Sequence, residues 1–417
     1  MLRSMFSAIS GLRAHQTKMD TVANNIANVN TVGYKSTNTV FETTLTQVLR
    51  DGKSPDSITG GANPAQIGLG VKLAAITTNF GQGKTQNTDR ALDFMIQGDG
   101  FFVTKDGNQQ LYTRAGSFSF DGTGNLTTAD GAVLQGWMAD AQGQVNTGGP
   151  LRDLQVAYGA TKQPKATDGT TIAGNLASGT ATGGTKSFQQ DMYDAQGTKH
   201  TVTFTYTKVA AAAAAPPAPA VPDNAWDMAM SEGATNYGTQ RVVFGADGKV
   251  STVGGAAATS ATFNPTWVGA DPVVADLSNL SQFATGAEVN ATVQTGYASG
   301  SLNSFALAND GTIIGVYSNG QRQAIGQLAL ATFNNPSGLV NMGNTSYAIG
   351  DNSGNALIGT AGTGSLGSLS SGALEMSNVD LSEEFTGLII AQRGFQANSR
   401  VISASDELLQ DLVNLKR

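Results

Sequence analysis

Few of the side chains that could do chemistry in this 417-residue chain are spaced to do so. The segment Gly81-Gln82-Gly83-Lys84-Thr85 resembles the end of a phosphate-binding loop. That loop needs a further glycine five residues before its Gly-Lys-Thr, and position 78 is threonine. No apolar strand and helix frame the segment, so we interpret it as a turn rather than a nucleotide site.

The other candidates for catalysis or metal binding are scattered. The two histidines, His15 and His200, lie far apart, and the chain has no cysteine, which excludes disulfides, thiol catalysis and cysteine-based metal sites. The Asp-Gly pairs lack the alternating acidic residues of a calcium-binding EF-hand loop. We expect no catalytic residues, no metal site and no cofactor, and we predict that the chain is not an enzyme.

Composition narrows the range of partners. Charged residues make up 13% of the chain, against a usual share of about 25%, so much of the polar surface must be uncharged. The net charge is −7 and no basic block is present, which argues against nucleic acid as a partner. No run of 18 apolar residues exists, so we expect no membrane span. The N-terminus lacks the continuous apolar core of a cleaved signal peptide, and we expect none.

The sequence pattern predicts helices most strongly at the two ends of the chain. Residues 1–30 and 375–417 repeat apolar residues every seven positions, and such a row stays on one helix face only when the helix pairs with another. Neither end has a partner adjacent in sequence, so we predict coiled-coil-like pairing with each other and with other copies of the chain. The predicted polymerisation interface consists of Met5, Ile9, Leu12, Met19, Ala23, Ile26, Leu381, Phe385, Leu388, Phe395, Ile402 and Leu409.

The residues between the two predicted helices favour β-structure. Asp-Gly and Asn-Gly pairs recur there and are typical of tight hairpin turns, although Phe41–Leu49 could form a short helix. Composition shifts near residues 150 and 296. We therefore predict an α+β multidomain fold with mainly β domains of barrel or sandwich type. Its parts are a terminal helical polymerisation domain (1–30 with 375–417), a linking segment (31–75), an inner β-domain (76–150 with 297–374) and an inserted outer β-domain (151–296).

The end of the first predicted helix is unusually rich in asparagine, with Asn24, Asn25, Asn28 and Asn30. Asparagine is a poor residue for a helix interior because its amide competes for backbone hydrogen bonds. From the residues alone, two interpretations stay open. The segment is either a frayed helix end or a place where amides bond to neighbouring chains.

The same segment resembles the signature of the bacterial flagellar rod and hook axial proteins. Further resemblance lies in Gln97–Phe102 with Tyr112–Phe118, in Leu374–Phe385 and in Gln392–Arg400, where Gly394 and Phe395 depart from the usual pair of the family. The match is weaker over 151–296. The residues that match the signature at the end of the first helix are Asn24, Asn25, Ala27, Asn28, Gly33, Tyr34 and Lys35.

This resemblance implies a structural subunit of the flagellar hook, a flexible tubular joint between rod and filament. The chain length and the size of the 151–296 insertion favour the hook over the distal rod, which is the nearest alternative. A secreted β-domain adhesin would explain the middle of the chain but not its helical ends. The implied partners are other copies of the chain, the rod, hook-cap and hook-filament junction proteins, and the type III export apparatus. The implied location is the extracellular part of the flagellum.

Overall fold

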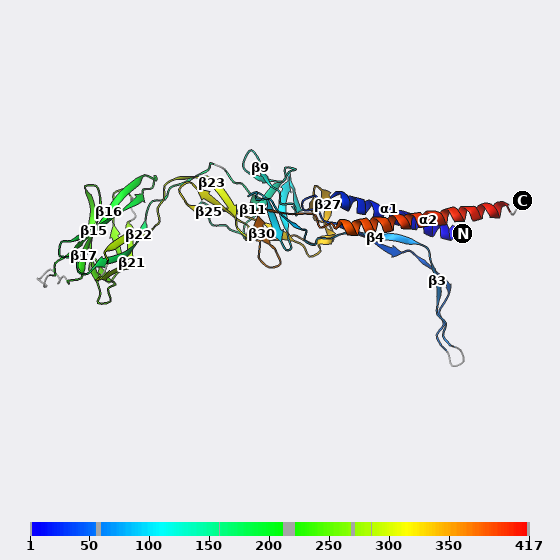
Figure 1. Ribbon diagram of the computed structural model, residues 1–417, viewed down its shortest axis with the longest axis horizontal. Coiled ribbons are helices and arrows are strands. Elements are labelled where there is room, and N and C mark those ends of the chain that lie inside the picture. The colour runs from blue at the N-terminus through cyan, green and yellow to red at the C-terminus, as the bar shows by residue number, and fades with distance from the viewer. Residues whose placement is uncertain are drawn as a thin grey trace. The chain divides into compact units, whose positions relative to one another are not determined.

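The computed structural model describes residues 2–55, 60–157, 159–211, 222–267, 272–284 and 286–414 (Figure 1). The chain forms two compact units. The first contains Met1–Ala157, Phe305–Gly315 and Gln323–Arg417, and the second contains Tyr158–Ser304 and Val316–Arg322. Strands dominate the described residues and a long helix lies at each end, which confirms the predicted α+β multidomain class.

The two helices of the first unit are α1 (Leu2–Ala27) and α2 (Leu381–Asn414), which lie side by side in Figure 1. The second helix begins later than residue 375, because Ala373–Glu375 form the strand β31. Asp380 then caps the helix: its carboxylate accepts the backbone N–H of Ser382 at 2.8 Å. Residues 415–417 of the predicted helical domain lie outside the described residues.

The segment after α1 is made of strands, so the expected helix at Phe41–Leu49 is wrong. Threonine, valine and phenylalanine alternate there and favour an extended, half-exposed backbone. β1 pairs antiparallel with β4, and β2 pairs antiparallel with β3. The bounds are β1 (Thr37–Thr43), β2 (Thr46–Arg50), β3 (Ala65–Gly68) and β4 (Val71–Thr78).

The β-region of the first unit is built around neighbouring strands in the order β25-β11-β7-β8-β28-β27. Its core contains Phe101, Val103, Tyr112, Trp137 and Phe333. The strands are β5 (Thr85–Asn87), β6 (Phe94–Gln97), β7 (Phe101–Asp106), β8 (Gln109–Thr113), β9 (Ser119–Phe120), β10 (Leu126–Thr127), β11 (Val133–Met138), β12 (Arg152–Asp153), β25 (Arg322–Leu328), β26 (Leu330–Thr332), β27 (Val340–Gly343), β28 (Ser346–Ala348), β29 (Leu357–Gly359), β30 (Ser368–Ser371) and β31.

Two sheets pack together in the second unit, in the orders β15-β16-β17-β18-β19 and β20-β21-β14-β22. Phe204, Trp226 and Phe263 lie in the core that they share. The strands of this unit are β13 (Thr161–Lys162), β14 (Gly169–Ala177), β15 (Thr185–Tyr193), β16 (Lys199–Lys208), β17 (Ala225–Glu232), β18 (Thr235–Phe244), β19 (Val250–Val253), β20 (Ser260–Phe263), β21 (Val273–Phe283) and β22 (Glu288–Gln294). The next two strands, β23 (Gly300–Leu307) and β24 (Thr312–Tyr317), each have residues in both units.

The chain enters and leaves these two sheets along one antiparallel ribbon. β13 pairs with β23, and further along the backbones of Lys165 and Tyr297 exchange hydrogen bonds of 3.1 and 3.0 Å. Residues 151–157 belong to the first unit, since β12 pairs with β11 and Leu154 is buried there. The compact second unit therefore starts about seven residues after the expected boundary at 151.

Candidate assembly surface and buried junction

The two helices pack antiparallel along a seam of small residues. Val22 lies beside Gly387, the His15 ring beside Gly394, and the Asn398 side chain beside Gly11. A β-carbon at Gly394 would lie 2.5 Å from two atoms of the His15 ring, so the seam depends on the missing side chain. Successive contacts are seven and four residues apart on each helix, a spacing that keeps them on one helix face, as in a coiled coil.

Burial follows the same seam. Among the described side chains of the two helices, the buried apolar residues are Ala8, Ala14, Val22 and Ala391, and Ser405 is also buried. Burial in the seam, with a smaller effect of Lys18, lowers the pKa of His15. The seam therefore favours the neutral imidazole.

The predicted interface residues lie outside this seam. Within the described chain none is buried: Ala23, Leu381, Phe385 and Phe395 are exposed, and the others are half-buried. The apolar rows are thus not buried within the single chain, and their role as the polymerisation interface stays a prediction. The half-buried residues are Met5, Ile9, Leu12, Met19, Ile26, Leu388, Ile402 and Leu409.

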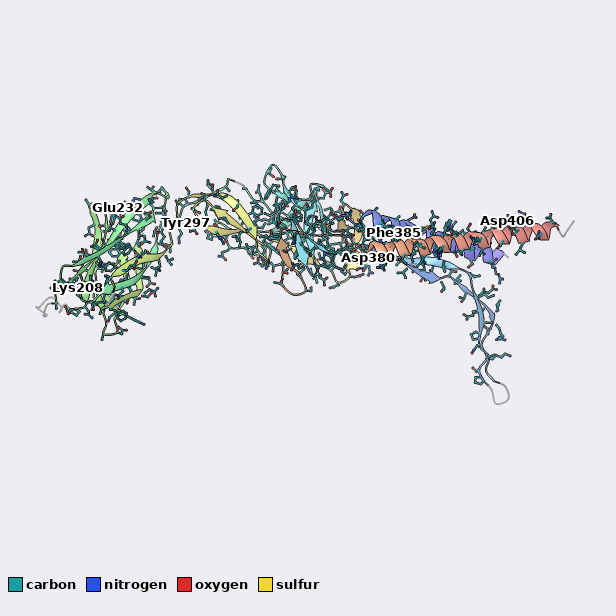
Figure 2. All side chains as sticks on the ribbon, viewed as in Figure 1. Lys208, Glu232, Tyr297, Asp380, Phe385 and Asp406 are labelled. Carbon is teal, nitrogen blue, oxygen red and sulfur yellow. The ribbon has the colours of Figure 1, made fainter. Side chains whose placement is uncertain are left out.

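Exposed apolar side chains continue along α2 and onto the neighbouring strands. Phe385 is 51% exposed near the start of α2, where Figure 2 labels it after Asp380. Ile389, Ile390 and Val401 are exposed further along the helix. The exposed apolar residues of the strand segment include Val40, Leu45, Val48, Leu49, Ile67, Leu69, Leu73 and Ile76. An apolar surface of this kind on one chain marks a place of interaction.

The asparagine-rich end of α1 is ordered by Asn25, whose side chain is 1% exposed. Its amide nitrogen donates to the Thr37 carbonyl at 2.9 Å and to Glu384 on α2 at 2.7 Å. Its amide oxygen accepts the Thr37 N–H at 3.0 Å and the Tyr34 hydroxyl at 3.1 Å. Asn25 thus ties the end of α1 to the start of β1 and to α2.

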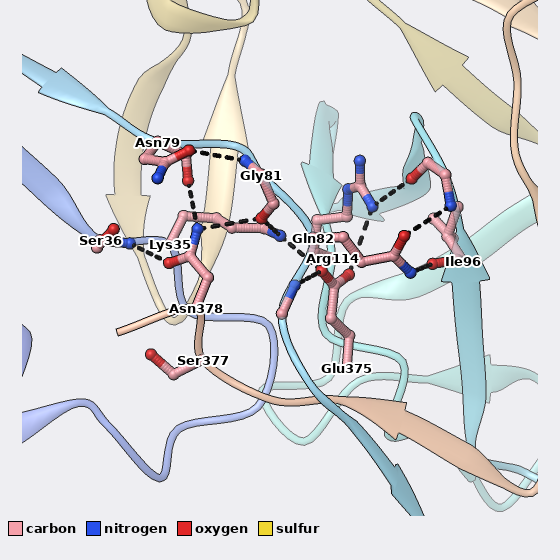
Figure 3. A network of polar contacts seen from close by, with 12 residues as sticks. Lys35, Ser36, Asn79, Gly81, Gln82, Ile96, Arg114, Glu375, Ser377 and Asn378 are labelled. Atoms are coloured by element: carbon pink, nitrogen blue, oxygen red, sulfur yellow. Dashed lines mark hydrogen bonds and ion pairs between the residues drawn. The ribbon is translucent and has the colours of Figure 1, made fainter. Parts of the chain in front are cut away.

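Further along the chain, Lys35 forms a buried ion pair with Glu375 at the end of β31 (Figure 3). The Nζ–Oε1 distance is 2.6 Å, and the two side chains are 0% and 1% exposed. Arg114 lies 3.4 Å from the other carboxylate oxygen and donates to the Gly98 carbonyl at 2.9 Å. Burial lowers the pKa of Lys35, while the negative charge of Glu375 opposes this shift.

Two loop segments complete this buried junction, which we define by Lys35, Glu375, Arg114 and Asn378 (Figure 3). The backbone N–H of Gly83 donates to Glu375 at 2.8 Å, and Lys35 donates to the Gly81 carbonyl at 2.8 Å. Asn378 accepts the N–H of Ser36 at 2.8 Å and donates to the Gly81 carbonyl at 3.0 Å. The segment that resembles a phosphate-binding loop therefore lines a structural ion pair.

Four protein families match segments of the chain. They are "Flagella basal body rod protein" at residues 5–35, "Flagellar hook protein FlgE/F/G D1 domain" at 95–173, "Flagellar basal body protein FlaE D2 domain" at 166–297 and "Flagellar basal body rod FlgEFG protein C-terminal" at 370–415. The flagellar hook protein FlgE of Borreliella burgdorferi is 36% identical over 100% of both chains. The chain belongs to the flagellar hook protein family.

Other relatives support the hook over the rod within this family. The hook protein FlgE of Escherichia coli K12 is 34% identical over 98% of this chain and 99% of its own. The flagellar basal-body rod protein FlgG of Bacillus subtilis is 30% identical over 100% of both chains. The crystal structure of the Helicobacter pylori flagellar hook protein FlgE2 covers 70% of this chain and all of its own with a TM-score of 0.54, and its 14% identity supports the fold.

Within the single chain, most of the signature residues serve packing and hydrogen bonding. Asn25, Gly33, Tyr34 and Lys35 lie in or beside the buried junction, and the backbone of Gly33 donates to the Glu375 carbonyl at 2.8 Å. Asn24 and Ala27 are exposed, and the Asn28 amide bonds back to Asn24 at 2.9 Å. The Asn25 amide therefore bonds to other elements of the same chain, whereas the Asn28 amide bonds within its own helix end, to Asn24.

Sequence reasoning missed Glu375, Arg114 and Asn378 as partners of the signature. Each lies in a segment that resembles the family, but their charges and amides gave no sign of pairing across hundreds of positions.

Among the described residues no cluster of three His, Asp or Glu side chains could hold a metal ion. None of the helices within the described ranges has the length and apolarity needed to cross a membrane.

Proposed function

We propose that this hook-family chain polymerises into a tube through its terminal helices and the β1–β4 segment. One observation carries the proposal: α1 and α2 already fill their mutual seam with small residues, yet their apolar heptad rows and Phe385 remain accessible. Covering such rows with a second helix layer would remove apolar area from water, at roughly 25 cal/mol per Å². Other copies of the same chain offer the matching surface.

We further propose four parts: the helical domain 1–30 with 375–417, the linking segment 31–75, the inner β-domain and the inserted outer β-domain. The matches to a D1 domain at 95–173 and a D2 domain at 166–297 support a division of the β-region. The helical domain would form the wall of the tube, and the β-domains would be attached to it. The chain would act as a structural subunit and not as an enzyme.

The proposed partners beyond the chain itself are the rod, the hook cap, the hook-filament junction and the flagellar type III export apparatus. The proposed location is the extracellular hook, reached without cleavage of a signal peptide. The support for these partners is the family and its full-length hook relatives.

Electron microscopy of the purified full-length chain in polymerising salt tests this function. Curved tubes are the expected product of a flexible joint. Straight tubes would favour the distal rod instead, and a chain that stays monomeric in every salt would contradict the proposal.

A further inference from the structure

α2 extends past Leu2, the first described residue of α1. In the antiparallel seam Gly11 lies beside Asn398 and Val22 beside Gly387, and the same register places Leu2 level with Glu407. Residues 408–414 of α2 therefore reach about 10 Å beyond Leu2, at 1.5 Å per helical residue. We call residues 406–414, which comprise these residues and the two before them, the overhang.

The overhang combines an exposed apolar residue with negative charge. Leu408 follows the buried seam residue Ser405 by three positions, about one helical turn, and it is 56% exposed. Asp406, Glu407 and Asp411 are exposed, and in the described parts of the chain none of them has an ion-pair partner. Figure 2 labels Asp406 near this end of the helix.

A groove of about 390 Å³ lies between α1 and β4 and has the opposite charge. Its apolar lining includes Phe6, Ile9 and Leu73, and Phe6 is 65% exposed. Its basic residues are Arg13 and Lys72. Lys72 pairs with Glu42 at 2.6 Å, whereas the exposed Arg13 guanidinium has no ion-pair partner within the described ranges.

We propose that the acidic overhang of one copy docks in this basic groove of the next copy. Leu408 would enter the apolar lining, and Arg13 would face Glu407 and Asp411, which lie one helical turn apart on α2. This inference rests on the proposed function, because it specifies a contact by which the copies join. Groove and overhang are different surfaces, so the contact is heterologous and can repeat without closing, as a growing tube requires.

Two charge reversals in the full-length chain test this contact. Arg13→Glu makes the groove acidic, and the double variant Glu407→Lys/Asp411→Lys makes the overhang basic. Each variant alone places like charges together, so sedimentation should show its critical concentration for polymerisation raised by about tenfold or more. The matched control Arg393→Glu, an exposed arginine elsewhere on α2, should polymerise as the wild type does.

Mixing the two variants in equal amounts gives the decisive result. In the mixture, the acidic groove of Arg13→Glu can receive the basic overhang of Glu407→Lys/Asp411→Lys. The native groove of the second variant can receive the native overhang of the first. The critical concentration for polymerisation should therefore return toward that of the wild type. Circular dichroism of each variant checks that its fold is intact. Normal polymerisation of the single variants, equal impairment of the control, or loss without rescue on mixing would overturn the contact while leaving the proposed function standing. A wild-type chain that never polymerises would instead overturn the proposed function, and this contact with it.

Discussion

At the scale of single residues, the buried junction places one carboxylate against two cations. Glu375 meets both Lys35 and Arg114, and the carbonyls of Gly81 and Gly98 accept further hydrogen bonds from these cations. Removing the carboxylate would leave the cations buried with only neutral acceptors. An uncompensated buried charge is among the more costly changes that a folded chain can undergo.

Glu375→Ala should therefore destabilise the first unit by roughly 3–5 kcal/mol. Urea unfolding of the full-length chain, followed by near-ultraviolet circular dichroism, measures this change. The matched control is Glu42→Ala, which breaks the exposed Lys72–Glu42 pair and should cost less than about 1 kcal/mol. Equal effects of the two variants would show that the junction has no special role in stability.

At the scale of elements, the antiparallel helix pair depends on fit between glycine and a large neighbour. Gly394→Ala would put a methyl group into the space of the His15 ring and should force the helices apart, at a cost of about 1–3 kcal/mol. The double variant Gly394→Ala/His15→Ala removes the ring and should recover part of the loss. Heat unfolding followed by helical circular dichroism measures both, and a neutral Gly394→Ala would contradict the close seam.

The seam should also respond to pH. The pKa of His15 is lowered, so the packed pair favours neutral histidine and loses stability as pH falls below the ordinary value of about 6.5, until the lowered pKa is passed. Burial raises the pKa of Glu384, so this group has the opposite effect and adds stability to the folded chain as pH falls. Comparing the wild type with His15→Gln at about pH 8 and pH 5.5 isolates the histidine. An identical pH dependence of stability in the wild type and in His15→Gln would show that His15 is not responsible.

The sequence revealed the helices but not their contact face. Apolar residues at sevens marked both helices, because leucine, isoleucine and methionine stand out from their neighbours. The seam itself is made of Gly11, Gly387, Gly394 and Ala391, whose small side chains carry little hydrophobic signal. The predicted rows are therefore half-buried or exposed in the single chain.

The buried junction was less predictable for a different reason. Lys35 and Glu375 are 340 positions apart, and nothing local distinguishes a buried lysine from a solvated one. The family resemblance singled out both segments without showing that they meet. The strands β1 and β2 were mistaken for a helix because a short apolar run does not by itself separate the two states.

At the scale of the whole molecule, we predict that the two packed sheets of the second unit can be deleted without unfolding the rest of the chain. The backbones of Lys165 and Tyr297 are hydrogen-bonded to each other, so the ends left by a deletion already lie together. Replacing residues 166–296 by a short Gly/Ser linker should give a soluble chain that still polymerises. Electron microscopy should show thinner tubes. A deletion variant that cannot fold would contradict the proposed domain division.

The central claim is that apolar residues left accessible on the helix pair join one copy to the next. Phe385→Asp tests it most directly, because Phe385 is 51% exposed and its loss should not disturb the single chain. The control Phe283→Asp makes the same change at a 52% exposed phenylalanine of the second unit. Electron microscopy of both in polymerising salt should show tubes for Phe283→Asp and none for Phe385→Asp. Normal tubes from Phe385→Asp would contradict the claim.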